Sequence, residues 1–190
     1  MVASLVLAAG RGARFGEGNK LLADVHGKPL LRHVVETALA SRASPTIVVT
    51  GHERAKVEAA LAGLSVTFAH NAAYASGLAS SLRVGLEAVT GAEGALVLLG
   101  DMPRVQTQTL DALIAAFEAA PACPAVVPAN RGRRGNPALL GRALFSAAIA
   151  LQGDEGARRL LRAAAAVVEV EVEDAGILLD IDTRDDLTRL

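Results

Sequence analysis

Short apolar runs alternate with longer amphipathic ones along this chain, and this alternation constrains the fold more than any other feature. Buried strands joined by crossover helices produce such a pattern, so it predicts an α/β fold with a mainly parallel sheet. We expect strands at residues 3–8, 46–50, 66–69, 95–99 and 125–128. We expect helices between them at 29–40, 53–62, 78–89 and 109–119, with Pro29 at the first helical position.

The alternation breaks after residue 128, where a loop rich in Gly and Arg covers 130–137. Beyond this loop we expect helices at 142–150 and 155–165, a strand pair at 167–172 and 177–181, and a terminal helix at 182–190, capped by Thr183 or Asp182. No linker or repeat interrupts the chain. We therefore expect one domain, residues 1–190, whose last third elaborates a site.

Composition excludes several classes of partner. The formal net charge is −1 and like charges form no block, so we expect no nucleic-acid partner. No apolar stretch approaches the roughly 20 residues of a membrane span, so we expect no membrane partner. The chain has one cysteine and a poor match to a signal peptide, and together these features indicate a cytoplasmic protein.

The segment from Leu7 to Lys20, LAAGRGARFGEGNK, follows the first expected strand. Its glycines allow backbone N–H groups to approach a phosphate closely, and Lys20 supplies a cation at the far end. The segment matches neither the P-loop pattern nor the dinucleotide-binding fingerprint. The alternative is an ordinary strand-to-helix turn with surface arginines.

Two aspartates are candidate metal ligands. Asp101 follows the apolar run 95–99, and the carboxyl end of a strand is where an α/β sheet binds ligands, so Asp101 is placed to hold Mg²⁺ on substrate phosphates. An Asp before a Met-Pro pair is also ordinary turn chemistry. Asp182 is the second candidate, although capping of a helix explains it nearly as well.

Two further segments carry polar groups suited to a ligand. Ser80 lies just inside an expected helix start and fits either a nucleotide contact or an N-cap. The run 131–137, which contains Asn136, is the only dense basic cluster in the sequence. Guanidinium groups there suit an anionic phosphate, and a solvated surface loop is the alternative.

Taken in order, six segments resemble the nucleotidyltransferase family that attaches a nucleoside monophosphate to molybdopterin. They are LAAGRGARFGEGNKLL, HNAAYASGLASSL, GDMP, RGNPALL, GDEGARRLL and DIDTRDDL, and they span nearly the whole chain. The resemblance implies a Rossmann-like three-layer nucleotidyltransferase fold with a mostly parallel sheet. Within the family, Ala9 and Asn19 are similar to the cytidylyltransferase branch, whereas guanylyltransferases usually carry AGG and Asp-Lys. Phe15 stands where a methionine is usual, and Arg184 where a proline is usual.

The resemblance also implies roles for particular residues. It places triphosphate binding on the first loop and its lysine, Mg²⁺ on Asp101, the nucleoside near Asn71 and Ser80, and the pterin near Asn136. The expected nucleotide-binding loop residues are Leu7, Ala8, Ala9, Gly10, Arg11 and Gly12. The expected catalytic residues are Lys20, Arg14 and Asp101, because they would neutralise charge that develops on the transferred phosphoryl group.

The implied reaction is attack of the molybdopterin phosphate on the α-phosphorus of CTP, with release of pyrophosphate. The expected partners are CTP, a molybdopterin-type cofactor and a client molybdoenzyme. One alternative is a nucleotidyltransferase of similar fold that uses GTP, or that acts on a sugar phosphate or methylerythritol phosphate. Another is a non-catalytic carrier that delivers the pterin cofactor to a molybdoenzyme.

Overall fold

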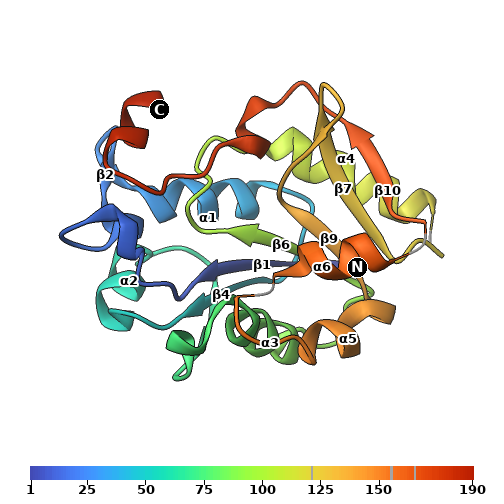
Figure 1. Ribbon diagram of the computed structural model, residues 1–190, viewed down its shortest axis with the longest axis horizontal. Coiled ribbons are helices and arrows are strands. Elements are labelled where there is room, and N and C mark those ends of the chain that lie inside the picture. The colour runs from blue at the N-terminus through green and yellow to red at the C-terminus, as the bar shows by residue number, and fades with distance from the viewer. Residues whose placement is uncertain (121, 155, 165) are drawn as a thin grey trace.

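The computed structural model describes residues 1–120, 122–154, 156–164 and 166–190. Within these residues the main sheet has eight strands, in the order β10-β7-β9-β6-β1-β4-β5, with β8 beside β7 (Figure 1). They are β1 (Val2–Ala8), β4 (Thr46–Thr50), β5 (Thr67–His70), β6 (Gly94–Leu99), β7 (Ala125–Asn130), β8 (Arg133–Arg134), β9 (Ala138–Gly141) and β10 (Val168–Glu171). A small separate hairpin consists of β2 (Asp24–Val25) and β3 (Lys28–Pro29).

Helices cover both faces of the sheet, and this confirms the α/β prediction. One face carries α1 (Leu30–Ala40), α2 (Arg54–Ala60) and α4 (Thr107–Ala119). The other carries α3 (Leu78–Ala88), α5 (Phe145–Ile149) and α6 (Ala157–Ala163). Side chains of a strand point alternately to its two faces, so in β1 Val6 packs in the first apolar cluster while Leu5 and Leu7 pack in the second. Two apolar layers thus enclose a buried central strand.

The centre of the sheet is parallel, and it contains the point where strand order reverses. β1 pairs in parallel with β4 on one side and with β6 on the other. The register of β1 and β6 sets Leu7 beside Leu99, so the two strands end side by side. In open α/β sheets a crevice for ligands forms beyond such strand ends. The loop after Leu7 and the turn after Leu99 therefore face the same crevice.

Strand β9 was not predicted, and of the predicted late strand pair the first strand, 167–172, is β10 whereas the second is wrong. β9 lies antiparallel between β6 and β7. β10 pairs in parallel with β7, whereas residues 177–181 form no strand. The short 3-10 helix Ala175–Leu178 lies there instead, because the side chain of Asp174 accepts a hydrogen bond from the N–H of Gly176 and starts the turn.

The observed helix boundaries also differ from the predicted ones. Pro29 precedes α1 instead of occupying its first position. The segment predicted as a terminal helix is a 3-10 helix, Asp185–Arg189. Its start is held by Asp186, whose carboxylate accepts hydrogen bonds from the N–H groups of Asp182 and Thr183, so neither of those residues is the cap. The helix predicted at 155–165 is α6, and both predicted ends lie outside the described residues.

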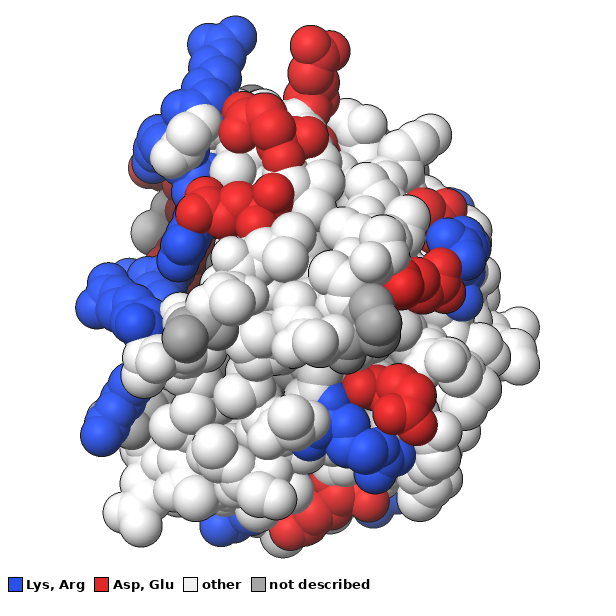
Figure 2. Space-filling model, turned by 90° about the vertical axis from the view of Figure 1, so that its right-hand side faces the viewer, with Lys and Arg blue, Asp and Glu red and all other residues white. Residues whose placement is uncertain are grey.

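Two further segments, 130–137 and 142–150, also differ from their predicted secondary structure. Within the loop 130–137, β8 pairs with the end of β7. The helix predicted at 142–150 begins as a 3-10 turn, Arg142–Leu144, before α5. No helix in the described part of the chain is long and apolar enough to cross a membrane. Figure 2 shows that the centre of the face on the right of Figure 1 is mostly uncharged, with basic side chains along its left edge and mixed basic and acidic groups on the lower and right sides.

Candidate active site

The loop after β1 presents unpaired backbone N–H groups. Gly12 has φ 59°, a left-handed conformation that favours glycine, and it turns the chain into the 3-10 helix Ala13–Phe15. Phe15 is buried and anchors the loop on the core. Among the described residues, the N–H groups of Gly10, Arg11 and Gly12 donate no hydrogen bond. The loop therefore offers donors that an anion can accept.

Asp101 is held against this loop by the backbone of the residue before it. The N–H of Gly100 donates to the carbonyl of Leu7 over 3.0 Å, which continues the pairing of β6 with β1 beyond the last strand residue. A Cβ at position 100 would lie 2.9 Å from that carbonyl oxygen, so a side chain there would push the strands apart. The carbonyl of Asp101 in turn accepts from the N–H of Ile181, and this bond brings Asp182 to the same place.

Lys20 joins the two aspartates. Its Nζ lies 2.6 Å from Oδ2 of Asp101 and 3.3 Å from Oδ1 of Asp182. Arg14 contributes a second cation, with a guanidinium nitrogen 2.9 Å from Oδ2 of Asp182. Burial alone would lower the pKa of Lys20, but the two carboxylates outweigh it and raise the pKa above its ordinary value. Four residues that the sequence predicted from separate segments thus form one charged cluster.

This cluster lies at one end of a cavity of about 630 Å³, called here the loop cavity. Most of the predicted nucleotide site lines it. The predicted residues in its wall are Leu7, Ala9, Gly10, Arg11, Gly12, Arg14, Lys20, Asp101 and Asp182. Ala8 is buried beneath the loop and is absent from the wall.

The donor set of the loop cavity fits a divalent cation shared with a substrate. Oδ1 of Asp101 is buried and has no hydrogen-bond partner among the described residues. The second carboxylate, Asp182, lies on the same lysine. No group of three or more His, Cys, Asp and Glu capable of holding a metal exists in the described part of the chain. Mg²⁺ typically takes one or two carboxylates and completes its shell with water and phosphate oxygens, which matches this pair.

Asn71 and Ser80 lie behind the loop cavity and do not line it. Asn71 is buried, and its Nδ2 donates to the hydroxyls of Ser80 and Ser81 over 2.8 and 3.0 Å. Of these residues only Ser81 reaches the cavity wall. Asn19 is buried as well, and its Oδ1 accepts from the N–H of Leu21, so it shapes the turn that carries Lys20. Within this geometry, contact with a base at Asn71, Ser80 or Asn19 stays a prediction.

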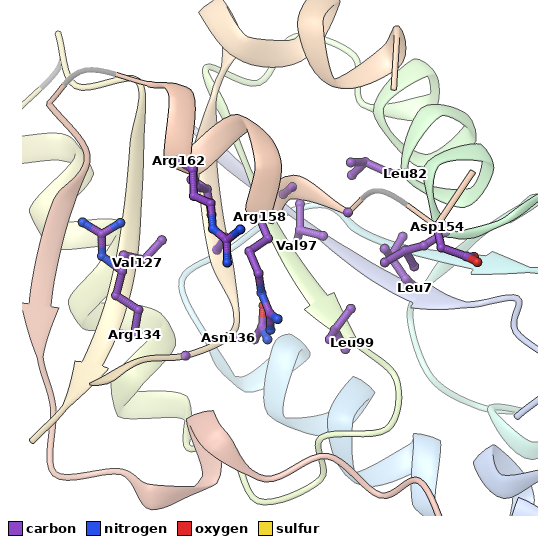
Figure 3. A pocket seen from close by; sticks show the side chains of 16 residues that line it. Leu7, Leu82, Val97, Leu99, Val127, Arg134, Asn136, Asp154, Arg158 and Arg162 are labelled. Atoms are coloured by element: carbon purple, nitrogen blue, oxygen red, sulfur yellow. The ribbon is translucent and has the colours of Figure 1, made fainter. Parts of the chain in front are cut away.

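A second cavity, of about 610 Å³, adjoins the first and is called here the arginine cavity. Its floor is apolar and includes Val97 and Leu99 from β6 (Figure 3). Asn136 lines it, as do Arg134, Arg158 and Arg162. The two cavities share the wall residues Leu7, Leu78, Leu99 and Asp154.

Asp154 reaches this boundary through a contact between distant segments. The N–H of Ala79 donates to the carbonyl of Gly153, which seats the segment before α6 on the start of α3. Gly77 makes this approach possible, because a Cβ there would lie 2.3 Å from the carbonyl carbon of Gly153. Within the predicted GDEGAR segment, Asp154 therefore lines both cavities, and residue 155 lies outside the described residues.

Among the wall residues that sequence reasoning missed are Tyr74 and Arg162. Tyr74 lines the loop cavity, and the guanidinium of Arg11 lies 5.5 Å from its ring centroid. Arg162 lines the arginine cavity four residues after Arg158. The helical spacing of these two arginines was the available signal for Arg162. Tyr74 gave no comparable signal, because a lone aromatic in a polar segment fits many environments.

Comparison with known proteins supports the family expected from the sequence. The family profile described as "MobA-like NTP transferase domain" matches residues 4–169. The chain belongs to this family. Among curated proteins, the bifunctional protein GlmU of Cupriavidus taiwanensis is 38% identical over 112 residues, which are 58% of this chain and 24% of that protein. The chain therefore spans about a quarter of the length of this relative.

Solved structures of similar size match nearly the whole chain. Rv0371c from Mycobacterium tuberculosis H37Rv aligns with a TM-score of 0.87 and 30% identity, over 99% of this chain and 96% of that one. Another structure of Rv0371c is described as a complex with manganese. A nucleotidyl transferase from Methanothermobacter, Mth528, aligns with a TM-score of 0.86 and 29% identity, over 100% and 95% of the two chains. These matches agree with the α/β nucleotidyltransferase fold described above.

Proposed function

We propose that this chain transfers CMP from CTP to the phosphate of a molybdopterin-type cofactor and releases pyrophosphate. The observation that carries the proposal is the pair of adjoining cavities, one lined by a phosphate-type loop with Lys20, Asp101 and Asp182, the other by arginines over an apolar floor. A two-substrate transfer requires two such compartments that meet at the reacting atoms.

In the proposed reaction an oxygen of the acceptor phosphate attacks the α-phosphorus of CTP. A new P–O bond forms as the bond between the α-phosphorus and the bridging oxygen breaks, and that oxygen leaves with its electron pair on pyrophosphate. No protein nucleophile is required, because the attacking oxygen already carries negative charge. The work of the protein is to position two anions and to offset their charge.

The residues of the loop cavity divide this work. In this proposal the free N–H groups of Gly10, Arg11 and Gly12 donate to the triphosphate, and Lys20 offsets the charge that develops on the leaving group. Asp101 and Asp182 would hold Mg²⁺, which when bound supplies Lewis-acid polarisation of phosphoryl oxygens. The single acceptor atom without a partner in this cluster, Oδ1 of Asp101, supports that assignment.

The choice of cytidine rests on Ala9 and Asn19, through the resemblance to the cytidylyltransferase branch. A thermal-shift series with CTP, GTP, ATP and UTP, each with Mg²⁺, tests it directly. We expect the largest shift with CTP, and a larger shift with GTP would overturn the choice of base. The same family would then use another nucleotide in the same cavity.

The transfer itself is tested by pyrophosphate release from CTP with each candidate acceptor. We expect release with a molybdopterin-type acceptor and none above background with a sugar phosphate or methylerythritol phosphate. Release driven by either of the latter would replace the proposed acceptor. Equal pterin binding with and without CTP and Mg²⁺, and no product, would favour a non-catalytic carrier. Asp101→Asn is the matched control, and it should lose the metal-dependent part of the CTP thermal shift.

A further inference from the structure

Two arginines of α6 line the arginine cavity, whose only described carboxylate is that of Asp154 at the boundary with the loop cavity. Arg158 and Arg162 both line this cavity, and Figure 3 shows their side chains directed into it, toward Asn136. Neither guanidinium forms an ion pair with any residue in the described part of the chain. Arg134, across the cavity, differs because it is paired with Glu169 over 2.6 Å.

This arrangement has an energetic cost that a ligand would remove. Like charges four residues apart on a helix repel each other, by about 0.2–0.5 kcal/mol on a solvated surface. Two guanidinium groups that converge on one space can together bind an anionic group through several charge-assisted hydrogen bonds. The apolar floor beneath them, which includes Val97 and Leu99, suits the uncharged body of the same ligand.

An anion bound by Arg158 and Arg162 would lie in a different cavity from the groups assigned to the reacting phosphates. Attack requires the two reacting atoms to lie about 3–3.5 Å apart, and the groups that act on the α-phosphoryl lie in the loop cavity. Arg158 and Arg162 line the arginine cavity and are absent from the wall of the loop cavity. Between the two compartments lie apolar side chains and the carboxylate of Asp154, which repels an anion placed at the boundary. Figure 3 shows Asp154 on the far side of Leu99 from the arginines.

We infer that the acceptor carries a second anionic group, remote from its reacting phosphate, and that Arg158 and Arg162 bind it. This inference rests on the proposed function, because it assigns the two cavities to one transfer. It defines the acceptor by chemistry: a phosphate at one end, an apolar or planar body over the floor of β6, and a further negative charge beneath α6. Acceptors that lack this charge are discriminated against by the two unpaired guanidinium groups.

A binding experiment with inorganic phosphate tests the site without requiring turnover. The protein is first saturated with Mg²⁺ and a non-hydrolysable CTP analogue, so that the loop cavity is filled, and phosphate is then titrated by calorimetry. We expect one phosphate to bind, and the variant Arg158→Gln/Arg162→Gln to weaken its affinity by about tenfold or more. Arg159→Gln is the matched control, since it removes the same charge from the same helix but does not line the arginine cavity.

The outcomes separate this inference from the proposed function. Equal phosphate affinity in the wild type and the double variant, or no binding by the wild type, would overturn the subsite even if CTP transfer is demonstrated. In the transfer assay, the double variant should raise KM for the acceptor by about tenfold or more while kcat changes by less than about threefold. An unchanged acceptor KM would show that the anion belongs to something other than the acceptor. A failure of CTP to bind at all would refute the proposed function. The phosphate titration would then be repeated on the protein without nucleotide, and equal affinity in the wild type and the double variant would overturn the subsite.

Discussion

The guanidinium of Arg184 lies 5.4 Å from the centroid of the Phe15 ring and also donates to the carbonyl of Glu17 over 2.7 Å. These contacts connect the loop from Leu7 to Lys20 to the segment that carries Asp182. Phe15 and Arg184 are the two positions at which the sequence departs from the usual pattern of the family it resembles. The structure shows that the two departures touch, so the ring and the guanidinium act as one pair.

Arg184→Ala should weaken nucleotide binding by loosening this loop. A cation–π contact contributes about 0.5–1 kcal/mol and a hydrogen bond to a carbonyl about 1 kcal/mol, so we expect a loss of CTP affinity of up to about 30-fold. Phe15→Leu keeps the apolar anchor but removes the ring, and its effect should not add fully to that of Arg184→Ala. Arg189→Ala, which breaks an ion pair with Asp186 in the same segment, serves as the control. Fully additive losses would show that the two residues act separately.

Lys20→Ala should lower kcat by about 10² to 10³, because it removes the cation that lies between the two carboxylates of the site. Lys28→Ala is the comparison, since Lys28 on β3 forms an exposed ion pair with Glu36 of α1 and does not line the loop cavity. Turnover is measured at saturating CTP and acceptor. Near-normal turnover in Lys20→Ala would remove Lys20 from the transition state.

The pH dependence of Lys20 follows from its raised pKa. Burial opposes the charged form, but Asp101 and Asp182 outweigh it, so the folded-state pKa exceeds the ordinary value. The stabilisation from the protonated lysine is therefore complete below the unfolded-state pKa and is lost only as the pH rises through the folded-state pKa. We expect no loss of kcat from Lys20 between about pH 7 and pH 10. An alkaline fall in kcat within this range that is absent in Lys20→Arg would contradict this assignment.

Asn71→Ala should destabilise the fold as well as weaken nucleotide binding. Its side chain donates to Ser80 and Ser81 and accepts from the N–H of Ala73, so its loss leaves buried polar groups without partners. We expect a cost of about 1–3 kcal/mol in urea unfolding. Ser81→Ala, at the cavity wall, should reduce nucleotide affinity with a smaller change in stability. An unchanged unfolding midpoint in Asn71→Ala would show that the network carries little energy.

The sequence predicted which segments meet at the loop cavity, because the signals for these segments are local. The loop from Leu7 to Lys20 and the turn at Asp101 each follow a buried apolar run directly. In a parallel sheet the carboxyl ends of neighbouring strands share an edge, so strand prediction alone brings these segments together. Asp182 was only one of two readings of its segment, since helix capping explained it nearly as well. Its position depends on the bond between Ile181 and Asp101, which no local pattern encodes.

The elements that were missed depend on pairing rather than on local preference. β9 has four residues and no amphipathic period, and its direction is set by the space between β6 and β7. Residues 177–181 are as apolar as a strand, but the carboxylate of Asp174 captures the N–H groups of Gly176 and Gln106 and turns the chain away. The contact between Phe15 and Arg184 is tertiary as well.

Strand β9 runs against both of its neighbours, and its register sets Ala138 beside Val97 near the end of β6. In a wholly parallel sheet only residues that follow strands reach the functional edge. An antiparallel strand places the residues that precede it at this same edge. Asn136, which precedes β9, therefore lies at the edge of the sheet where Asp101 follows β6. The hairpin at 130–137 can then lengthen, shorten or change sequence without moving the strands that carry the nucleotide loop. The fold thereby places the wall of the arginine cavity on a connection that is separate from the loop after β1, so the two cavities can change independently.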